Sequence, residues 1–562
     1  MLKKSIFAAI VVSIFCFTGC DLLFSLLSSN NTDEKVDYSN QTLYSHKGNA
    51  AYKNNYLIKF NKSIEYELDG AYAGYSKSEN VVNETANRSA DVSQMNLSKA
   101  FDSNGLSKWN DTEAITKLNE IVMKDVFPAS RSLTAQNSIE STITKINSSI
   151  GDTQPFYYIS DSTNYTYSQA AAKCKYTGEH CEVWFINNSS LVKENNLDFD
   201  SLGNKFDSIF ELETEILGSN IYSEHKTSYI DPQDKIIILI LDIFEDASTE
   251  QKAGTFGYFS QIDMYTDNAI NNSQDVRSFK SNKKQMLYID SYFYSLDGKN
   301  SSFNAVNQIY STLSHEFNHL LNFCNKTIKN NLDSYETWYT EMLSMITEDM
   351  FQEFLGISDA DGPKGRLNYF SQFYSYGFPY WRSGDDVYIS YANDYAYGAY
   401  LIRNHGGIAL LKEIATNKYV DGESITYALK EIGETPSSEM KSLGYNTVDF
   451  DYTIREFPLV LLNYKNTSDI TLNKKAETNS SDLSFTAINL NEFSKTIDKS
   501  YKPFIFDSNK YANLGPYGFT IHELSSDTFD YYKPFSNFLE YMDGFLAGKN
   551  DNQPGVLYEK LY

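Results

Sequence analysis

The chain has 562 residues, with 73 Asp and Glu against 48 Lys and Arg, so its formal net charge is −25. This length exceeds what one hydrophobic core usually organises, so several domains are expected. The acidic balance and the lack of a basic cluster argue against a nucleic-acid-binding protein. They favour solubility and argue against nonspecific binding to anionic surfaces.

The N-terminal sequence predicts export. Two Lys residues precede an apolar run over residues 6–17, which is typical of a secretory signal peptide and too short for a stable membrane span. The small residues before Cys20 resemble a lipobox, where a bacterial lipoprotein is cleaved and acylated on the Cys. We predict a lipoprotein-type signal peptide over 1–19 and a lipidated Cys20 with a polar tether over 20–35. A plain secreted protein with an incidental Cys is the alternative.

Residues 36–228 mix short aromatic strand patterns with one or two helical stretches, which predicts an N-terminal β-containing domain. Within it, Cys174 and Cys181 are separated by six residues. Outside the cytoplasm this spacing suits a disulfide that closes a hairpin or loop. A second metal site made by the two Cys and His180 is a weaker alternative.

Three β-prone segments follow. The continuous apolar run 236–241 predicts a buried central strand, and 257–260 and 286–290 predict two shorter strands. We expect these strands to form a small sheet that leads into a helix.

That helix carries an H-E-x-x-H motif at residues 315–319. Apolar residues recur at spacings of three and four over 306–320 without Gly or Pro, which predicts an amphipathic helix. His315 and His319 lie four residues apart, so both imidazoles can face one Zn²⁺. Glu316 lies beside them, where its carboxylate can take a proton from a metal-bound water. The alternative is a helix with two incidental His, which is less favoured because the chain has only seven His.

A third ligand must come from another segment, because catalytic zinc usually takes three protein ligands and leaves one position for water. The residues after His319 lack the Gly and His of the longer pattern H-E-x-x-H-x-x-G-x-x-H, so that pattern is excluded. A second helical pattern over 335–351 places Glu341 and Glu348 on one stripe with a Trp and a Met. Carboxylates on such a stripe need a partner if they are buried.

We predict Glu341 as the third metal ligand. Glu348 is predicted to orient a ligand His through a hydrogen bond, and a solvated position on the helix rim is its alternative. Three other carboxylates compete for the ligand position: Asp333, Glu336 and Asp349.

The two helices together resemble the hyicolysin family of bacterial zinc metallopeptidases. These gluzincin-like enzymes have an H-E-F-x-H helix and a W-x-x-E-x-x-S helix, and both patterns occur here within 315–349. The resemblance covers about residues 230–410. It implies zinc bound by His315, His319 and Glu341, with Glu316 as the catalytic base. The residues flanking Glu341 are Thr and Met where many gluzincins have Asn and Gly, which affects the contacts expected at the substrate edge.

The resemblance also implies two features around the metal. Gluzincin-like proteases hold the substrate backbone on an edge strand, and residues 254–265 are the candidate segment. Related enzymes place a Tyr or His opposite the metal to stabilise the oxyanion, and Tyr395, Tyr397 and His405 are the candidates. The alternatives are Tyr side chains in the core and a His that complements a helix C-terminus.

Helical patterns continue to about residue 440, and residues 465–562 alternate turns with strands, which predicts a C-terminal β-rich domain. The expected fold class is therefore α+β and multidomain. A zincin-like catalytic domain at 229–464, built from a small β-sheet and active-site helices, is flanked by β-rich N- and C-terminal domains.

These features predict an exported zinc-dependent endopeptidase, lipid-anchored in the bacterial cell envelope, that hydrolyses a protein or peptide substrate. Metal-activated water would be the nucleophile and Glu316 the general base and acid. One alternative is a surface adhesin or binding lipoprotein with a vestigial metal site, although such a site would not need Glu316. A zinc hydrolase acting on a non-peptide bond is the other. No nucleic-acid partner is expected.

Overall fold

The computed structural model describes most of the chain, namely residues 43–63, 110, 112–123, 138–249, 254–272, 278–296, 305–332, 335–383, 386–462, 476–477, 483–488, 514–524, 528–532, 542–550 and 556–561. The predicted signal peptide, Cys20 and the tether lie outside these residues. Within the described ranges, none of the helices combines the length and apolarity that a membrane crossing requires.

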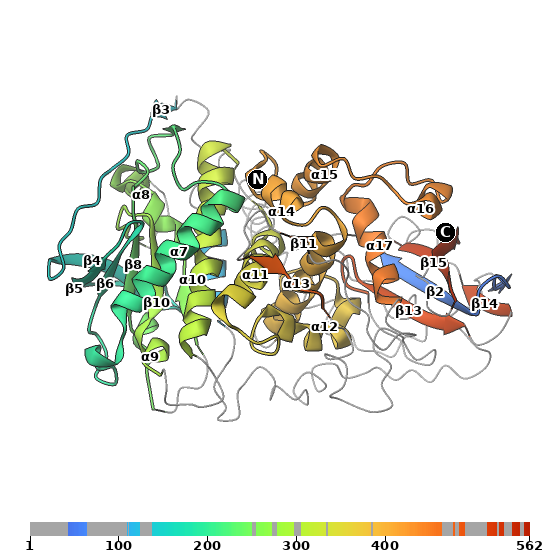
Figure 1. Ribbon diagram of the computed structural model, residues 1–562, viewed down its shortest axis with the longest axis horizontal. Coiled ribbons are helices and arrows are strands. Elements are labelled where there is room, and N and C mark those ends of the chain that lie inside the picture. The colour runs from blue at the N-terminus through green and yellow to red at the C-terminus, as the bar shows by residue number, and fades with distance from the viewer. Residues whose placement is uncertain are drawn as a thin grey trace, which may run out of the picture.

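A six-stranded mixed sheet forms one end of the molecule (Figure 1). In spatial order its strands are β4 (Thr153–Asp161), β5 (Thr166–Thr177), β6 (Cys181–Phe185), β8 (Ile236–Leu241), β10 (Met286–Asp290) and β9 (Gly257–Tyr258). β6, β8 and β10 are parallel, and β9 pairs antiparallel to β10 at the edge. All six residues of β8 are buried, which is why its sequence is a continuous apolar run.

This sheet corrects the predicted boundary between residues 228 and 229. β4, β5 and β6 belong to the predicted N-terminal domain, yet β6 pairs in parallel with β8 of the predicted catalytic domain. The two predicted domains therefore share one sheet. The pairing joins segments about 50 residues apart, and a local sequence pattern contains no signal for such a pairing.

The predicted disulfide between Cys174 and Cys181 is wrong. Cys174 lies opposite Trp184, whereas Cys181 lies opposite Gly178. The N–H of Gly178 donates to the carbonyl oxygen of Cys181 at 2.8 Å. The two Cys are thus four positions apart along the hairpin, roughly 13 Å, whereas a disulfide needs Cα atoms within about 7 Å. Both thiols are free and buried.

The middle of the molecule is helical (Figure 1). α7 (Phe199–Leu217), α10 (Ala305–Asn322), α11 (Thr337–Leu355) and α13 (Val387–Asn404) pack one against the next, starting from the sheet. The Asp198 side chain caps α7 by accepting from Ser201 N–H at 3.0 Å. Phe317, the middle residue of the H-E-x-x-H motif, packs against Phe206 and Phe210 of α7, with ring centroids 5.1 and 5.3 Å away. This anchor holds one side of α10, so the two His face the other way.

Shorter elements complete the helical part and connect it to the sheet. They are α5 (Glu113–Ile121), α8 (Asp267–Asn272), α9 (Ser291–Tyr294), α12 (Leu367–Phe373), α14 (Ile408–Thr416), α15 (Asp421–Glu431), α16 (Ser438–Ser442), α17 (Phe450–Leu462), a π-helical turn Phe323–Lys329 after α10, and the strands β3 (Ile139–Glu140), β7 (Glu224–His225), β11 (Ala476–Glu477) and β12 (Ser484–Phe485).

A four-stranded antiparallel sheet lies at the opposite end of the molecule (Figure 1). Its order is β13 (Phe519–Leu524), β2 (Asn54–Asn61), β15 (Met542–Lys549) and β16 (Val556–Lys560). Beside it, β1 (Leu43–Lys47) pairs with β14 (Thr528–Tyr532). The predicted C-terminal β-rich domain is therefore completed by strands from near the N-terminus, which is a second correction to the predicted boundaries.

The turn before β13 docks on the helical part at Gly377. Gly515 N–H donates to Ser375 O at 2.9 Å, and Asn393 of α13 donates to Gly377 O at 2.6 Å. Gly377 has φ +69°, and a Cβ there would lie 1.6 Å from the carbonyl oxygen of Pro516. The joint between the sheet and the helices therefore requires a residue without a side chain.

We expect Gly377→Ala to lower the free energy of unfolding by about 3 kcal/mol or more, because it adds a backbone collision to a left-handed conformation. Gly433 is the matched control, since it also has a positive φ, +78°, but no atom lies within 4 Å of its added Cβ. Gly433→Ala should cost only about 1 kcal/mol. Thermal unfolding of the two variants checks this, and equal losses would contradict the docking role of Gly377.

Candidate active site

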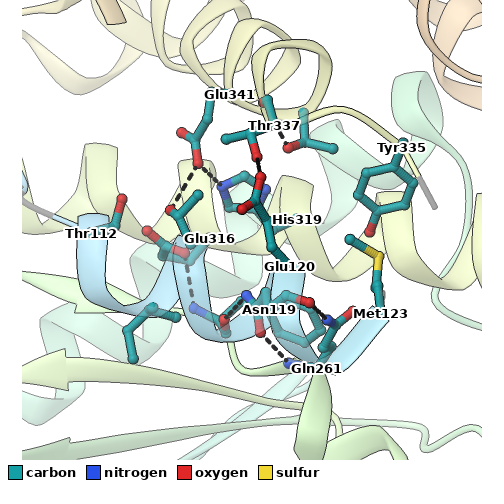
Figure 2. A pocket seen from close by; sticks show the side chains of 14 residues that line it. Thr112, Asn119, Glu120, Met123, Gln261, Glu316, His319, Tyr335, Thr337 and Glu341 are labelled. Atoms are coloured by element: carbon teal, nitrogen blue, oxygen red, sulfur yellow. Dashed lines mark hydrogen bonds and ion pairs between the residues drawn. The ribbon is translucent and has the colours of Figure 1, made fainter. Parts of the chain in front are cut away.

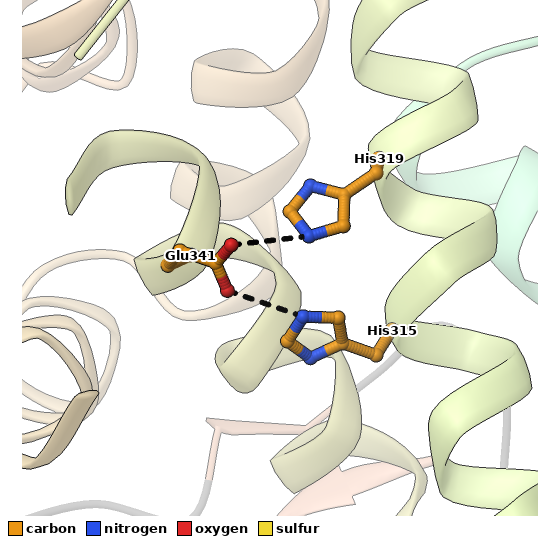
Figure 3. A group of neighbouring side chains, drawn as sticks. All are labelled: His315, His319 and Glu341. Carbon is orange, nitrogen blue, oxygen red and sulfur yellow. Dashed lines mark ion pairs between the residues drawn. The ribbon is translucent and has the colours of Figure 1, made fainter. Parts of the chain in front are cut away.

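Helices α10 and α11 bring His315, His319 and Glu341 together (Figure 3). His315 Nε2 lies 3.2 Å from Glu341 Oε2, and His319 Nε2 lies 3.5 Å from Glu341 Oε1. Each of the three residues offers one ligand atom, and these three atoms all lie within 4.8 Å of one another. His315 and Glu341 are buried, and His319 is partly exposed on the cleft side.

The donor set of this cluster fits a zinc ion. Tetrahedral ligands at the usual 2.0–2.1 Å from zinc lie about 3.3 Å from one another, close to the two distances above. His315 Nε2 and Glu341 Oε2 are buried and have no hydrogen-bond partner among the described residues. Burial without a hydrogen bond is costly for such atoms unless a cation lies between them.

Two of the three competing carboxylates, Asp349 and Glu336, lie elsewhere. Asp349 forms a buried ion pair with Arg403, at 2.7 Å between Oδ2 and a guanidinium nitrogen. Glu336 is exposed just before the start of α11, and Asp333 lies outside the described residues.

Glu348, two turns after Glu341, holds His315 in orientation. Its Oε1 lies 2.7 Å from His315 Nδ1, and its Oε2 accepts from Ser311 Oγ at 3.0 Å. A proton on Nδ1 leaves Nε2 free to face Glu341, which is how carboxylates set the tautomer of metal-binding His. Ser344 Oγ lies 3.4 Å from the ring of His319 and donates to Asn318 at 3.0 Å.

Burial and the neighbouring carboxylates set the charge of both imidazoles. Burial lowers the pKa of His319 to about 4, which keeps it in the neutral form that binds metals. Burial also opposes the protonation of His315, but the adjacent carboxylates of Glu341 and Glu348 raise its pKa well above the usual range. In the protein without a cation, His315 thus supplies the positive charge that the two carboxylates require.

The side chain of Glu316 extends from α10 toward the edge strand β9. Its Oε2 accepts from Phe259 N–H at 2.9 Å, just beyond β9, and its Oε1 accepts from Asn110 Nδ2 at 3.2 Å. Burial raises the pKa of Glu316 to about 8, although His315 opposes the shift. A carboxylate with a pKa near neutrality can both accept and donate a proton.

A cavity opens beside these residues (Figure 2). Glu316, His319 and Glu341 line it together with Phe259 and Gln261, which follow β9. The opposite wall is α5, which contributes Ile115, Thr116, Asn119 and Glu120. No sequence pattern indicates α5 as part of the site, because its residues lie about 200 positions before the motif and match no pattern of metal ligands.

Tyr395, Tyr397 and His405 do not lie at this site, which corrects their predicted oxyanion role. Tyr395 donates to Asp349 at 2.9 Å, Tyr397 pairs with Thr453 at 2.7 Å, and His405 pairs with Glu456 at 2.9 Å. The described residues that line the cavity include none of the three. They sit on or next to α13, which packs behind α11, so their side chains fill the core. The Tyr that lines the cavity is Tyr335, just before α11.

An H-E-x-x-H helix beside an edge strand, with a Glu supplied by the next long helix, is the arrangement of a metallopeptidase. Residues 179–443 match the family model Peptidase M30. Over 290 residues the chain is 28% identical to "Neutral metalloprotease ShpI" of Staphylococcus hyicus, an alignment that covers 50% of this chain and 59% of the relative. The alignment thus covers less than two thirds of the length of this relative.

The resemblance to hyicolysin-like M30 metallopeptidases that was drawn from the two helices is therefore confirmed. The match begins at residue 179, between β5 and β6, and so crosses the predicted boundary at 228 and 229. The match to a metalloprotease family implies a metal cofactor, and the cluster of His315, His319 and Glu341 could hold it.

We expect Glu348→Gln to weaken zinc binding about 10- to 100-fold, because an amide orients His315 less strongly and makes its Nε2 a poorer donor. Competition with a chromophoric chelator measures this affinity. Glu353→Gln is the control, since Glu353 lies on the same helix but is exposed and hydrogen-bonded to Ser484. Equal affinities of the two variants would contradict the orienting role of Glu348.

His405 gives the protein a pH-dependent stability that is separate from the metal site. Burial lowers its pKa, but hydrogen bonds to Glu434 and Glu456 outweigh burial and raise it to about 9, from 6.5. Because the folded pKa is the higher one, the stabilisation is complete below pH 6.5 and is lost as the pH rises through about 9. The full effect is roughly 3 kcal/mol.

We expect the melting temperature to fall between pH 6 and pH 9.5 less steeply in His405→Gln than in wild type or in the control His180→Gln. Parallel slopes would contradict this assignment.

Proposed function

We propose that the chain is an exported zinc endopeptidase whose active site is the cluster of His315, His319, Glu341 and Glu316. The observation that carries this proposal is the position of Glu316, which lies between the three candidate ligands and the edge strand β9. The family match and the relative named as a neutral metalloprotease support it.

Zinc held by His315, His319 and Glu341 would polarise a peptide carbonyl and acidify a water molecule. Glu316 would take a proton from the attacking water and then give it to the nitrogen of the leaving amine. Its buried position keeps its carboxylate basic enough for the first step. Phe259 N–H donates to Oε2 at 2.9 Å, and Asn110 donates to Oε1 at 3.2 Å.

The edge strand supplies the second part of the site. β9 and the residues that flank it, 256–261, carry backbone groups on the side facing the cavity. An extended peptide can pair with such an edge as an added strand, and main-chain hydrogen bonds then give affinity for many sequences. This recognition favours cleavage within a polypeptide.

Two further parts of the proposal rest on sequence alone. A lipid anchor at Cys20 and a location in the cell envelope follow from residues 1–35, which lie outside the described residues. The alternative of a binding lipoprotein with a vestigial metal site is less well supported, because such a site has no use for a buried carboxylate held beside the ligands.

We expect Glu316→Gln to lower kcat for casein about 10²- to 10⁴-fold, the contribution of general acid–base catalysis, while one zinc still binds per chain. Purified residues 21–562 with zinc, and the same protein with a chelator, provide the comparison. Glu211→Gln, an exposed change on α7, should leave the rate unchanged. Hydrolysis that persists in Glu316→Gln would exclude the proposed mechanism.

A further inference from the structure

We propose that helix α5 is an autoinhibitory segment that occupies the substrate site, so that peptide hydrolysis is slowed until α5 is displaced. This inference rests on the proposed function, because it assigns the occupied cleft to a peptide substrate. Figure 2 shows α5 lying across the cavity, with the side chains of Asn119 and Glu120 toward the site. Thr116 Oγ1 donates to Glu341 Oε1 at 3.3 Å, so the helix reaches the candidate metal ligands themselves.

Two Asn side chains take the hydrogen bonds that the edge strand offers to a substrate. Asn110 accepts from Phe256 N–H at 2.6 Å and donates to Gly257 O at 2.8 Å. Asn119 donates to Phe259 O at 3.0 Å and accepts from Gln261 N–H at 3.3 Å. A primary amide carries the same donor and acceptor as a peptide unit. The two side chains therefore pair with successive stretches of the edge as a bound peptide would.

Asn110 also engages the candidate general base. The same Nδ2 group that donates to Gly257 also donates to Glu316 Oε1 at 3.2 Å. A water molecule that approached Glu316 for deprotonation would compete with this amide. Asn110, three residues before α5, and Asn119 of α5 therefore cover the substrate edge, and Asn110 also blocks Glu316, the proposed proton acceptor.

Apolar and polar contacts hold α5 against both walls of the cleft. Ile115 and Leu118 are only 2% and 0% exposed. Thr112 pairs with Tyr391 of α13 at 2.7 Å, and Ala114 O accepts from Tyr165, between β4 and β5, at 3.1 Å. Glu120 accepts from Thr337 Oγ1 at the start of α11. The helix thus bridges the sheet side and the helical side of the site.

The family match places α5 outside the common domain. The Peptidase M30 segment covers 179–443 and contains the metal cluster, the edge strand and α11, whereas α5 ends at residue 121. The cleft is therefore built by the common domain and filled by a segment that precedes it.

The test compares variants that release α5 from the cleft. Leu118→Asp puts a carboxylate without a partner into a fully buried position and should expel the helix. Asn110→Ala with Asn119→Ala removes the hydrogen bonds to the edge strand and alters no core residue, so it remains informative if Leu118→Asp fails to fold. Lys117→Ala is the matched control, because Lys117 is exposed on the same helix.

The first readout is the initial rate of casein hydrolysis with one zinc bound per chain. We expect both releasing variants to be at least about tenfold faster than wild type, since several hydrogen bonds or the apolar anchor are lost, and Lys117→Ala to match wild type. Adding Glu316→Gln to either releasing variant should abolish the gain. Equal rates in wild type and the releasing variants would overturn the inference and leave the proposed function standing.

The second readout does not depend on activity. A fluorescent dipeptide hydroxamate needs both zinc and a free edge strand to bind, and its Kd should fall at least about tenfold in the releasing variants. If the releasing variants bind the hydroxamate more tightly but neither they nor wild type hydrolyse casein, the proposed function is wrong. The occlusion of the site by α5 would then still be supported. An unchanged Kd in both releasing variants would overturn the inference.

Discussion

The packing of α10 against α11 is the constraint on which the site depends. Helical periodicity alone aligns His315 with His319, but Glu341 reaches them only because a second helix lies in a fixed register beside the first. Polar contacts between the two helices hold that register, Glu348 to His315 and Ser344 to Asn318, while Phe317 anchors α10 on α7. A buried carboxylate between two imidazoles would be unstable in a loosely packed pair, so the polar cluster and the apolar packing require each other.

Much of this centre could be predicted from the sequence because its signals are local. The spacing of the two His, the stripe that carries Glu341 and Glu348, and the apolar run of β8 all lie within single elements. The candidate edge segment 254–265 contains β9, which lies at the edge of the sheet among the described strands. Two helices are enough to indicate the hyicolysin-like family, because their chemistry is concentrated in a few side chains of unusual type.

The errors of prediction have a common physical cause. Parallel pairing of β6 with β8, and insertion of β2 between β13 and β15, join segments whose local patterns contain no information about one another. Spacing alone predicts a disulfide between Cys174 and Cys181, although strand geometry separates them. The chemistry of Tyr395 and Tyr397 suits an oxyanion, yet a hydroxyl on a buried helix face can be satisfied by Asp349 or Thr453 as well as by a reaction intermediate. Helix α5 was missed because inhibition needs only ordinary amides and a Thr in the right place.

The insertion of β2 also constrains the order in which the molecule assembles. Residues 54–61 must wait for residues 519–549 before the four-stranded sheet can close, which is a loop of more than 450 residues. The entropic cost of closing the loop grows only with the logarithm of its length. Contacts between residues so far apart in the sequence nevertheless form late and slow folding. During synthesis an unpaired β2 would be an exposed strand edge that is prone to association with other chains. A chain that crosses a membrane in an extended state would postpone this step until the whole polypeptide had emerged on the far side.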